Sequence, residues 1–226
     1  MIVRAPDPRE WERLRTVARG GALLVVAIAL AAIAGWYGGI EVLTRVRSHY
    51  SAMVPATAIC FALAGFGLFA CAGRATGWRA ATGLVFAALI GAVAVLNLTP
   101  LVDTFGDSLA PLLAPAAHAD RMAVGTSIFF VLAAIALAAV ARPHAVPAGV
   151  LQLVATLGIA GSLVALSGYI TGAEALYTNH IFTAMALHTA LCFAVFFLAA
   201  LLARPQETWF GLLCGPTGGG RTARRL

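Results

Sequence analysis

Long apolar stretches without a charged residue alternate with short segments that carry polar and charged side chains. Six of these stretches are long enough to cross the hydrocarbon core of a bilayer, which takes about 20 helical residues. They cover residues 20–40, 52–73, 80–102, 122–141, 143–173 and 175–203. The pattern predicts an all-α integral membrane protein with six transmembrane helices.

A nine-residue motif opens the second, fourth and sixth of these stretches. Its copies share Met at the first position, Thr at the fifth and Phe at the ninth, and they cover residues 53–61, 122–130 and 185–193. A segment that recurs along a chain indicates one structural unit used several times. We therefore expect three helical-hairpin repeats, about residues 20–73, 80–141 and 146–204, in a pseudo-threefold arrangement.

The composition agrees with the membrane class. Hydrophobic residues make up 61% of the 226 residues and charged residues only 11%, whereas about a quarter of the residues in a soluble domain are charged. The net charge of +6 comes from 15 basic residues, all of them arginine. These arginines lie at the ends of the predicted helices, where they can attract anionic lipid headgroups. We therefore expect the lipid bilayer as a partner and no nucleic acid.

The positions of the arginines also predict the orientation in the membrane. If the N-terminus is cytoplasmic, only Arg45, Arg47 and Arg121 fall on the outer side. Basic residues near short loops stay on the cytoplasmic side during insertion, so both termini are expected in the cytoplasm and the protein in the bacterial inner membrane. Residues 1–19 are expected to form a cytoplasmic interfacial segment with a short amphipathic helix. Residues 205–226 are expected to form a second interfacial segment with a basic tail.

The repeated motif supplies the first candidate ligand-binding or sensing residues. Helical residues four apart lie on one face, so the Met and Thr of each copy should point the same way near the outer membrane boundary. These residues are Met53, Thr57, Met122, Thr126, Met185 and Thr189. Helix packing is the other interpretation, because hydroxyl and small side chains are common where membrane helices meet.

Polar side chains inside the apolar stretches add further candidates. His188 is an ionisable residue within the sixth stretch, and such residues usually face the protein interior and often have a function. Tyr37 and Tyr169 each lie 16 residues before a motif Met. They are expected either to anchor a helix at the membrane interface or to line a ligand site. Asn97 is expected to hydrogen-bond to a neighbouring helix.

A metal site is a further hypothesis for the outer side. His49, His118 and His180 precede Met53, Met122 and Met185 by four, four and five residues. Thioether and imidazole ligands at one membrane depth would suit copper. A haem and the absence of any cofactor remain open as alternatives.

Residues toward the C-terminal end resemble a known class of membrane region. The pairs Gly168-Tyr169 and Leu176-Tyr177, the motif copy 185–193 and the closing Ala203-Arg204-Pro205 are similar to the N-terminal membrane sensory input region of bacterial sensor histidine kinases and diguanylate cyclases. The resemblance implies that the membrane region detects a signal and that a separate cytoplasmic domain performs the catalysis. The chain has no phosphoacceptor-histidine helix, ATP-binding domain or GGDEF motif, so we expect it to be non-catalytic by itself.

Three functions remain open at this point. The first is a sensory input module for signal transduction, as in a two-component system, which would work as a homodimer or larger membrane assembly with an output domain in cis or in trans. The second is an accessory structural subunit of a larger membrane complex. The third is a copper- or haem-binding membrane protein.

Overall fold

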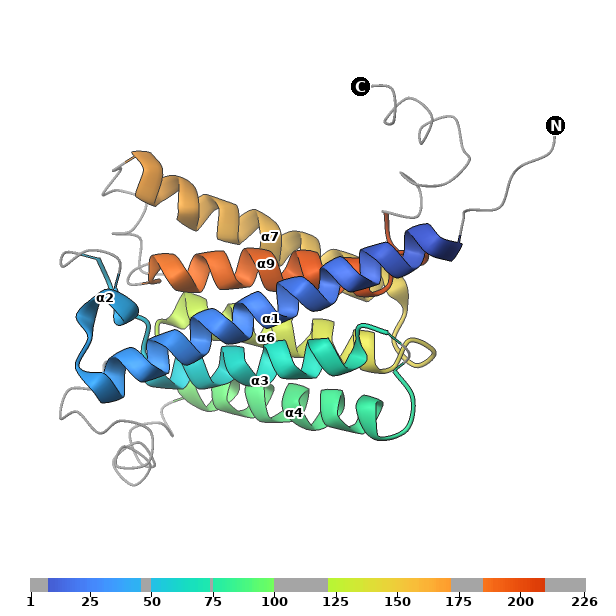
Figure 1. The fold of residues 1–226 in the computed structure, drawn as a ribbon, viewed down its shortest axis with the longest axis horizontal. Helices are drawn as coiled ribbons and strands as arrows, with labels where there is room; N and C mark the ends of the chain where they lie inside the picture. Colours follow the sequence, from blue (N-terminus) through green and yellow to red (C-terminus); the bar gives the residue numbers. More distant parts are fainter. Residues whose placement is uncertain (1–7, 46–49, 74, 100–121, 172–184, 210–226) are drawn as a thin grey trace.

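A computed structural model describes residues 8–45, 50–73, 75–99, 122–171 and 185–209. All regular elements in these ranges are helices, as the sequence predicts (Figure 1). They are α1 (Pro8–Gly38), α2 (Glu41–Thr44), α3 (Pro55–Cys71), α4 (Trp78–Leu98), α6 (Val124–Ala141), α7 (Ala148–Thr171) and α9 (Leu187–Ala203). The connection at 101–121, predicted to lie on the outer side, is outside the described residues.

Helices α3, α6 and α9, which begin just after the motif methionines, form the centre of the bundle. Each of these core helices contacts the other two. The surrounding helices each pack against two core helices, α1 on α3 and α9, α4 on α3 and α6, and α7 on α6 and α9. The start of α1 and the end of α9 lie at the same end of the bundle (Figure 1). We call this the exit end, and the opposite end, where the core helices begin, the motif end.

The surrounding helices turn large apolar side chains away from the protein. These exposed residues include Leu23, Leu24 and Leu30 on α1, Val85, Leu89 and Val93 on α4, and Leu153, Leu157 and Leu163 on α7. A soluble protein rarely exposes such continuous apolar surface, and a helix satisfies all its backbone groups in lipid. These outward faces therefore suggest a lipid bilayer as the environment of the protein.

Four helices, α1, α4, α6 and α7, are long and apolar enough to cross a membrane. The core helices α3 and α9 are apolar but have 17 residues each, which gives about 26 Å at 1.5 Å per residue. The structure thus supports an all-helical membrane protein. Six spans remain a prediction, as do the repeats and the orientation of the termini.

Glycines on α3 allow close approach both of a surrounding helix and of another core helix. A Cβ atom at Gly65 of α3 would lie 2.6 Å from Cγ2 of Val26 and 2.8 Å from the Ala22 carbonyl oxygen, both on α1. A Cβ at Gly67 of the same helix would lie 2.9 Å from Cδ2 of Leu137 on α6. Small residues at such contacts are the usual way in which membrane helices pack.

Residues 8–19 do not form a helix separate from the first apolar stretch. Residues from Pro8 onward belong to α1, which continues without interruption for 31 residues. Trp11 is buried by the protein, with 7% of its surface exposed, and Ala18 and Ala22 are fully buried on the same helix. Residues 9–19 contain no glycine or proline, so nothing local ends the helix before it enters the apolar stretch.

Several predicted helix boundaries also need correction. The second stretch becomes helical at Pro55, the third ends at Leu98, and the fifth begins at Ala148. In the sixth stretch, α9 begins at Leu187, after Ala186, which is extended with φ −61° and ψ 150°. Apolar residues that precede a helix cannot be told from the helix itself by hydropathy alone.

Candidate functional site

The three motif copies adopt the same local geometry at the motif end. The residue after each methionine has extended backbone, and the helix begins at the next residue. The first backbone hydrogen bonds are also equivalent. The amide of Ala58 donates to the Val54 carbonyl at 3.1 Å, that of Ser127 to Ala123 at 3.0 Å, and that of Ala190 to Ala186 at 3.0 Å.

The side chains at the first, fifth and ninth motif positions are buried in the core. All three methionines and all three threonines are buried; they are Met53, Met122, Met185, Thr57, Thr126 and Thr189. One turn further along the core helices, the phenylalanines of the three copies meet. The ring centroids of Phe61 and Phe130 are 4.8 Å apart, those of Phe61 and Phe193 4.6 Å, and those of Phe130 and Phe193 4.8 Å. We call these three residues the phenylalanine trio.

Each motif methionine also accepts a hydrogen bond on its backbone carbonyl from the surrounding helix that precedes it. Trp36 Nε1 of α1 donates to the Met53 carbonyl at 2.7 Å, and Asn97 Nδ2 of α4 donates to the Met122 carbonyl at 2.8 Å. The Tyr169 hydroxyl of α7 donates to the Met185 carbonyl. Three different donor types thus perform one task, and we call these contacts the methionine-carbonyl bonds.

The methionine-carbonyl bonds have a direct physical reason. The carbonyl of each methionine precedes its helix and receives no bond from the helical ladder, while the methionine itself is buried. A buried carbonyl without a partner is costly, and in an apolar environment few other donors are available. The side chain from the neighbouring helix therefore fixes where each core helix starts.

Tyr37 is not the structural counterpart of Tyr169, although both lie 16 residues before a motif methionine, and its role as an interfacial anchor stays a prediction. Its side chain is 69% exposed, and the half-buried Trp36 is the donor that corresponds to Tyr169. The connection after α1 contains Gly39, with φ +65°, and the short helix α2. The α7–α9 connection includes residues outside the described ranges, so equal residue counts do not guarantee equal positions. Adjacent helical residues point about 100° apart, and a slip of one residue turns Tyr37 outward.

The structure confirms the prediction that Asn97 hydrogen-bonds to a neighbouring helix. In addition to the Met122 carbonyl, its Nδ2 donates to Ser127 Oγ of α6 at 2.8 Å. Asn97 replaces the aromatic donors of the other two hairpins. The sequence signal was a single amide side chain within an apolar stretch, where a polar group needs a partner.

An aromatic contact joins two of the three motif regions. The rings of Tyr50, just before the first motif, and Tyr169 meet edge to face, with centroids 4.9 Å apart. Tyr169 therefore both holds the Met185 carbonyl and contacts the segment that leads to Met53. The starts of α3 and α9 are connected through this one side chain.

His188 lies in the first turn of α9 and is half-buried. Its Nδ1 is buried and has no hydrogen-bond partner among the residues that the structure describes. It is the only motif-end histidine among the candidates with a described position, since His49, His118 and His180 lie outside the described residues.

The copper and haem hypotheses stay predictions. Within the described ranges, no three His, Cys, Asp or Glu side chains come together as metal ligands. The donors that the structure does place at the motif end are the buried thioethers and the His188 imidazole. The histidine part of the proposed copper site falls on residues that the structure does not describe.

Asn97→Leu is expected to lower the free energy of unfolding by about 1–2 kcal/mol, because the Met122 carbonyl loses its donor. Ser127→Ala is the matched control, since it removes one partner of Asn97 and leaves the bond to Met122 intact. Denaturation with SDS in mixed micelles measures both values. Equal losses in the two variants would contradict a dominant role for the Met122 carbonyl.

Comparisons of the chain with models of protein families, with curated proteins and with solved structures gave no match. The long apolar helices of the fold support the class of helical membrane proteins. The resemblance to sensory input regions rests on the motif residues alone.

Proposed function

We propose that this chain is the membrane-embedded sensory input module of a bacterial signalling protein. In this proposal the three hairpins are repeats, the motif end faces outward, and both termini lie in the cytoplasm. The module is non-catalytic by itself and passes a signal to a cytoplasmic output domain in cis or in trans. Assembly as a homodimer or larger complex belongs to the same proposal.

The observation that carries the proposal is the set of methionine-carbonyl bonds. They connect each core helix to a helix that faces lipid, at the end where the candidate sensing residues lie. Helix α9 begins two residues after Met185, whose carbonyl accepts the hydrogen bond from Tyr169. The other end of α9 lies at the exit end, where it leads into residues 204–209. A displacement at the motif end therefore has a continuous helix along which to reach the exit end.

The phenylalanine trio favours a sensory function over a channel that would conduct ions between the core helices. The three rings contact one another at the centre of the core and are fully buried. They fill the space between the core helices with apolar atoms, which does not favour an open polar pathway there.

A ligand or a change in the lipid would act by a difference in affinity for two arrangements of the core. His188, the fourth residue of the third motif copy, is the proposed contact for such a ligand. Its Nδ1 is buried and has no hydrogen-bond partner among the described residues. Thr189 is the next residue on α9, and Met185 lies three residues before His188, just ahead of α9; both would complete the contact surface.

The proposal can be tested by fusing the chain in frame to the catalytic domain of a diguanylate cyclase. Tyr169→Phe removes one hydrogen bond worth about 1 kcal/mol, so the cyclase output should change about fivefold. Tyr37→Phe removes the same hydroxyl from an exposed side chain and should leave the output unchanged. The measurement is the cellular cyclic dinucleotide level at equal membrane abundance.

The same fusion decides between the alternatives. His188→Ala should also change the output if His188 contacts the signal. If neither variant changes the output while both proteins fold, the sensing proposal is wrong and an accessory structural subunit is favoured. Bound copper or haem, detected by metal analysis and an absorption spectrum of the purified protein, would favour the metal-binding alternative.

A further inference from the structure

Two core helices end in the same three residues at the exit end. Ala141-Arg142-Pro143 ends α6, and Ala203-Arg204-Pro205 ends α9. Proline has no amide hydrogen, so the carbonyl four residues before it loses its helical donor. The affected carbonyls are those of Ala139 in α6 and Leu201 in α9.

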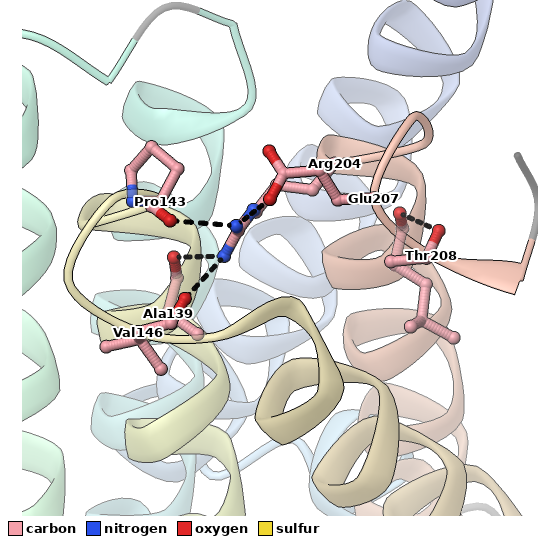
Figure 2. Close-up of polar contacts among 7 residues, drawn as sticks. Ala139, Pro143, Val146, Arg204, Glu207 and Thr208 are labelled. Atoms are coloured by element: carbon pink, nitrogen blue, oxygen red, sulfur yellow. Dashed lines mark hydrogen bonds and ion pairs between the residues drawn. The ribbon is translucent and has the colours of Figure 1, made fainter.

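These two carbonyls are satisfied in different ways (Figure 2). Leu201 accepts from groups that follow it in its own segment, the Arg204 amide at 3.3 Å and the Thr208 hydroxyl at 3.4 Å. Ala139 instead accepts from Arg204 Nη1 of the neighbouring helix, at 2.9 Å. The side chain that ends α9 thus completes the end of α6.

Arg204 extends this contact to the turn between α6 and α7. Its Nη2 donates to the Pro143 carbonyl at 3.0 Å, and its Nη1 also lies 3.4 Å from the Val146 carbonyl oxygen. Nη2 forms an ion pair with Glu207, three residues further along the chain. The Arg204 side chain is 5% exposed and that of Glu207 46%.

Burying a guanidinium is costly unless hydrogen bonds and a counter-ion replace water. Here the end of α6 and the α6–α7 turn supply the carbonyls, and Glu207 supplies the carboxylate. Arginine suits this role, because its planar group donates in several fixed directions at once. The end of α9, the α6–α7 turn and the segment after α9 therefore share one charged group.

We propose that Arg204 is a latch that couples the direction of the chain after α9 to the position of the α6–α7 turn. The latch rests on the proposed sensory function and names the element through which the signal would leave the membrane domain. Movement of α9 relative to α6 breaks at least one of the carbonyl bonds of Arg204. Residues 205–209 then lose the contact that fixes their path.

Arg142 provides a matched control within the same molecule. It occupies the equivalent position in α6, but its side chain is exposed, and the described part of the chain contains no side-chain hydrogen bond from it. Substitution by lysine keeps the charge at both positions, but it should affect the latch only at Arg204.

The test uses the full chain in lipid vesicles with spin labels on both sides of the latch. Ala145→Cys in the turn and Gln206→Cys after α9 are exposed labelling positions. Cys214→Ser removes a competing thiol, and the cysteines within the described helices are buried. The distance distribution between the two labels is measured by EPR.

Arg204→Lys keeps the charge but cannot hold the several carbonyls together, so the distribution should become about twofold broader. Arg142→Lys should leave it unchanged. An unchanged distribution in Arg204→Lys overturns the latch. If Arg204→Lys does not accumulate in the membrane, Glu207→Gln decides, because it removes the ion pair from the exposed side, and an unchanged distribution there also overturns the latch.

The cyclase fusion separates failure of the latch from failure of the sensory function. Output that responds to Tyr169→Phe but not to Arg204→Lys would retain the sensor and reject the latch as its exit. Broader EPR distances in Arg204→Lys, with no output change in any motif-end variant, would retain the mechanical contact and reject the sensor.

Discussion

Phe193→Ala is expected to lower the free energy of unfolding by about 3 kcal/mol, the lower end of the range for truncating a buried phenylalanine. Phe193 is fully buried, and its ring meets four others, those of Phe61, Phe129, Phe130 and Phe197. Lipid is as apolar as the core, so the transfer term is small and the loss comes from the cavity and the missing contacts. The measurement is SDS denaturation in mixed micelles.

Leu198→Ala is the matched control on the same helix. Its side chain is 43% exposed, so it exchanges contacts with lipid and should change the stability little. Phe61→Ala and Phe130→Ala should cost somewhat less than Phe193→Ala, because ring contacts to Phe129 and Phe197 are made by Phe193. If Phe193→Ala is no more destabilising than Leu198→Ala, the phenylalanine trio does not hold the core helices together.

The helical class and the convergence of the motifs could be predicted because both follow from sequence patterns with a simple physical basis. Apolar stretches of membrane length have few options other than helices. Segments with the same residues at the same offsets, such as Met53 to Phe61 and Met185 to Phe193, adopt the same local geometry. The Phe at the ninth position was noted only as a shared motif residue, and its three copies meet in the core.

The donors of the methionine-carbonyl bonds were harder to predict. The sequence does not show which backbone carbonyl will accept a side-chain hydrogen bond, because every residue has one. The donors are an indole, an amide and a phenol at Trp36, Asn97 and Tyr169, so no single residue type recurs. The equal spacing of Tyr37 and Tyr169 from a motif methionine does not identify the donor either, because Trp36 is the residue that bonds to Met53.

Arg204 shows a different limit of sequence reasoning. Its position at a helix end was explained by membrane topology alone, and that explanation applies equally to Arg142. The proline after each arginine does reveal that a carbonyl is left without its donor. Which arginine turns inward depends on which helices are neighbours, and only the structure gives that, with Arg204 buried and Arg142 exposed.

Gly158→Ala is expected to destabilise the protein by about 1–3 kcal/mol, the usual cost of overpacking. A Cβ at Gly158 of α7 would overlap with the ring of Phe197 on α9, whose Cγ would lie 2.6 Å away. The ring cannot move aside easily, because Phe196 packs edge to face against it and Phe193 stacks on it, with centroids 5.5 and 6.0 Å away. Helices α7 and α9 must therefore separate.

Gly149→Ala on the same helix isolates this effect from helix propensity. A Cβ at Gly149 meets no atom within 4 Å, so this variant should be neutral or gain up to about 1 kcal/mol from the better helix propensity of alanine. The same SDS titration measures how the change in unfolding free energy differs between the two glycine variants of this helix. Equal effects at both positions would contradict the close contact of α7 with α9. A loss at Gly158 that Phe197→Leu partly restores would show that the ring itself is the obstacle, since the smaller side chain leaves room for the added methyl group.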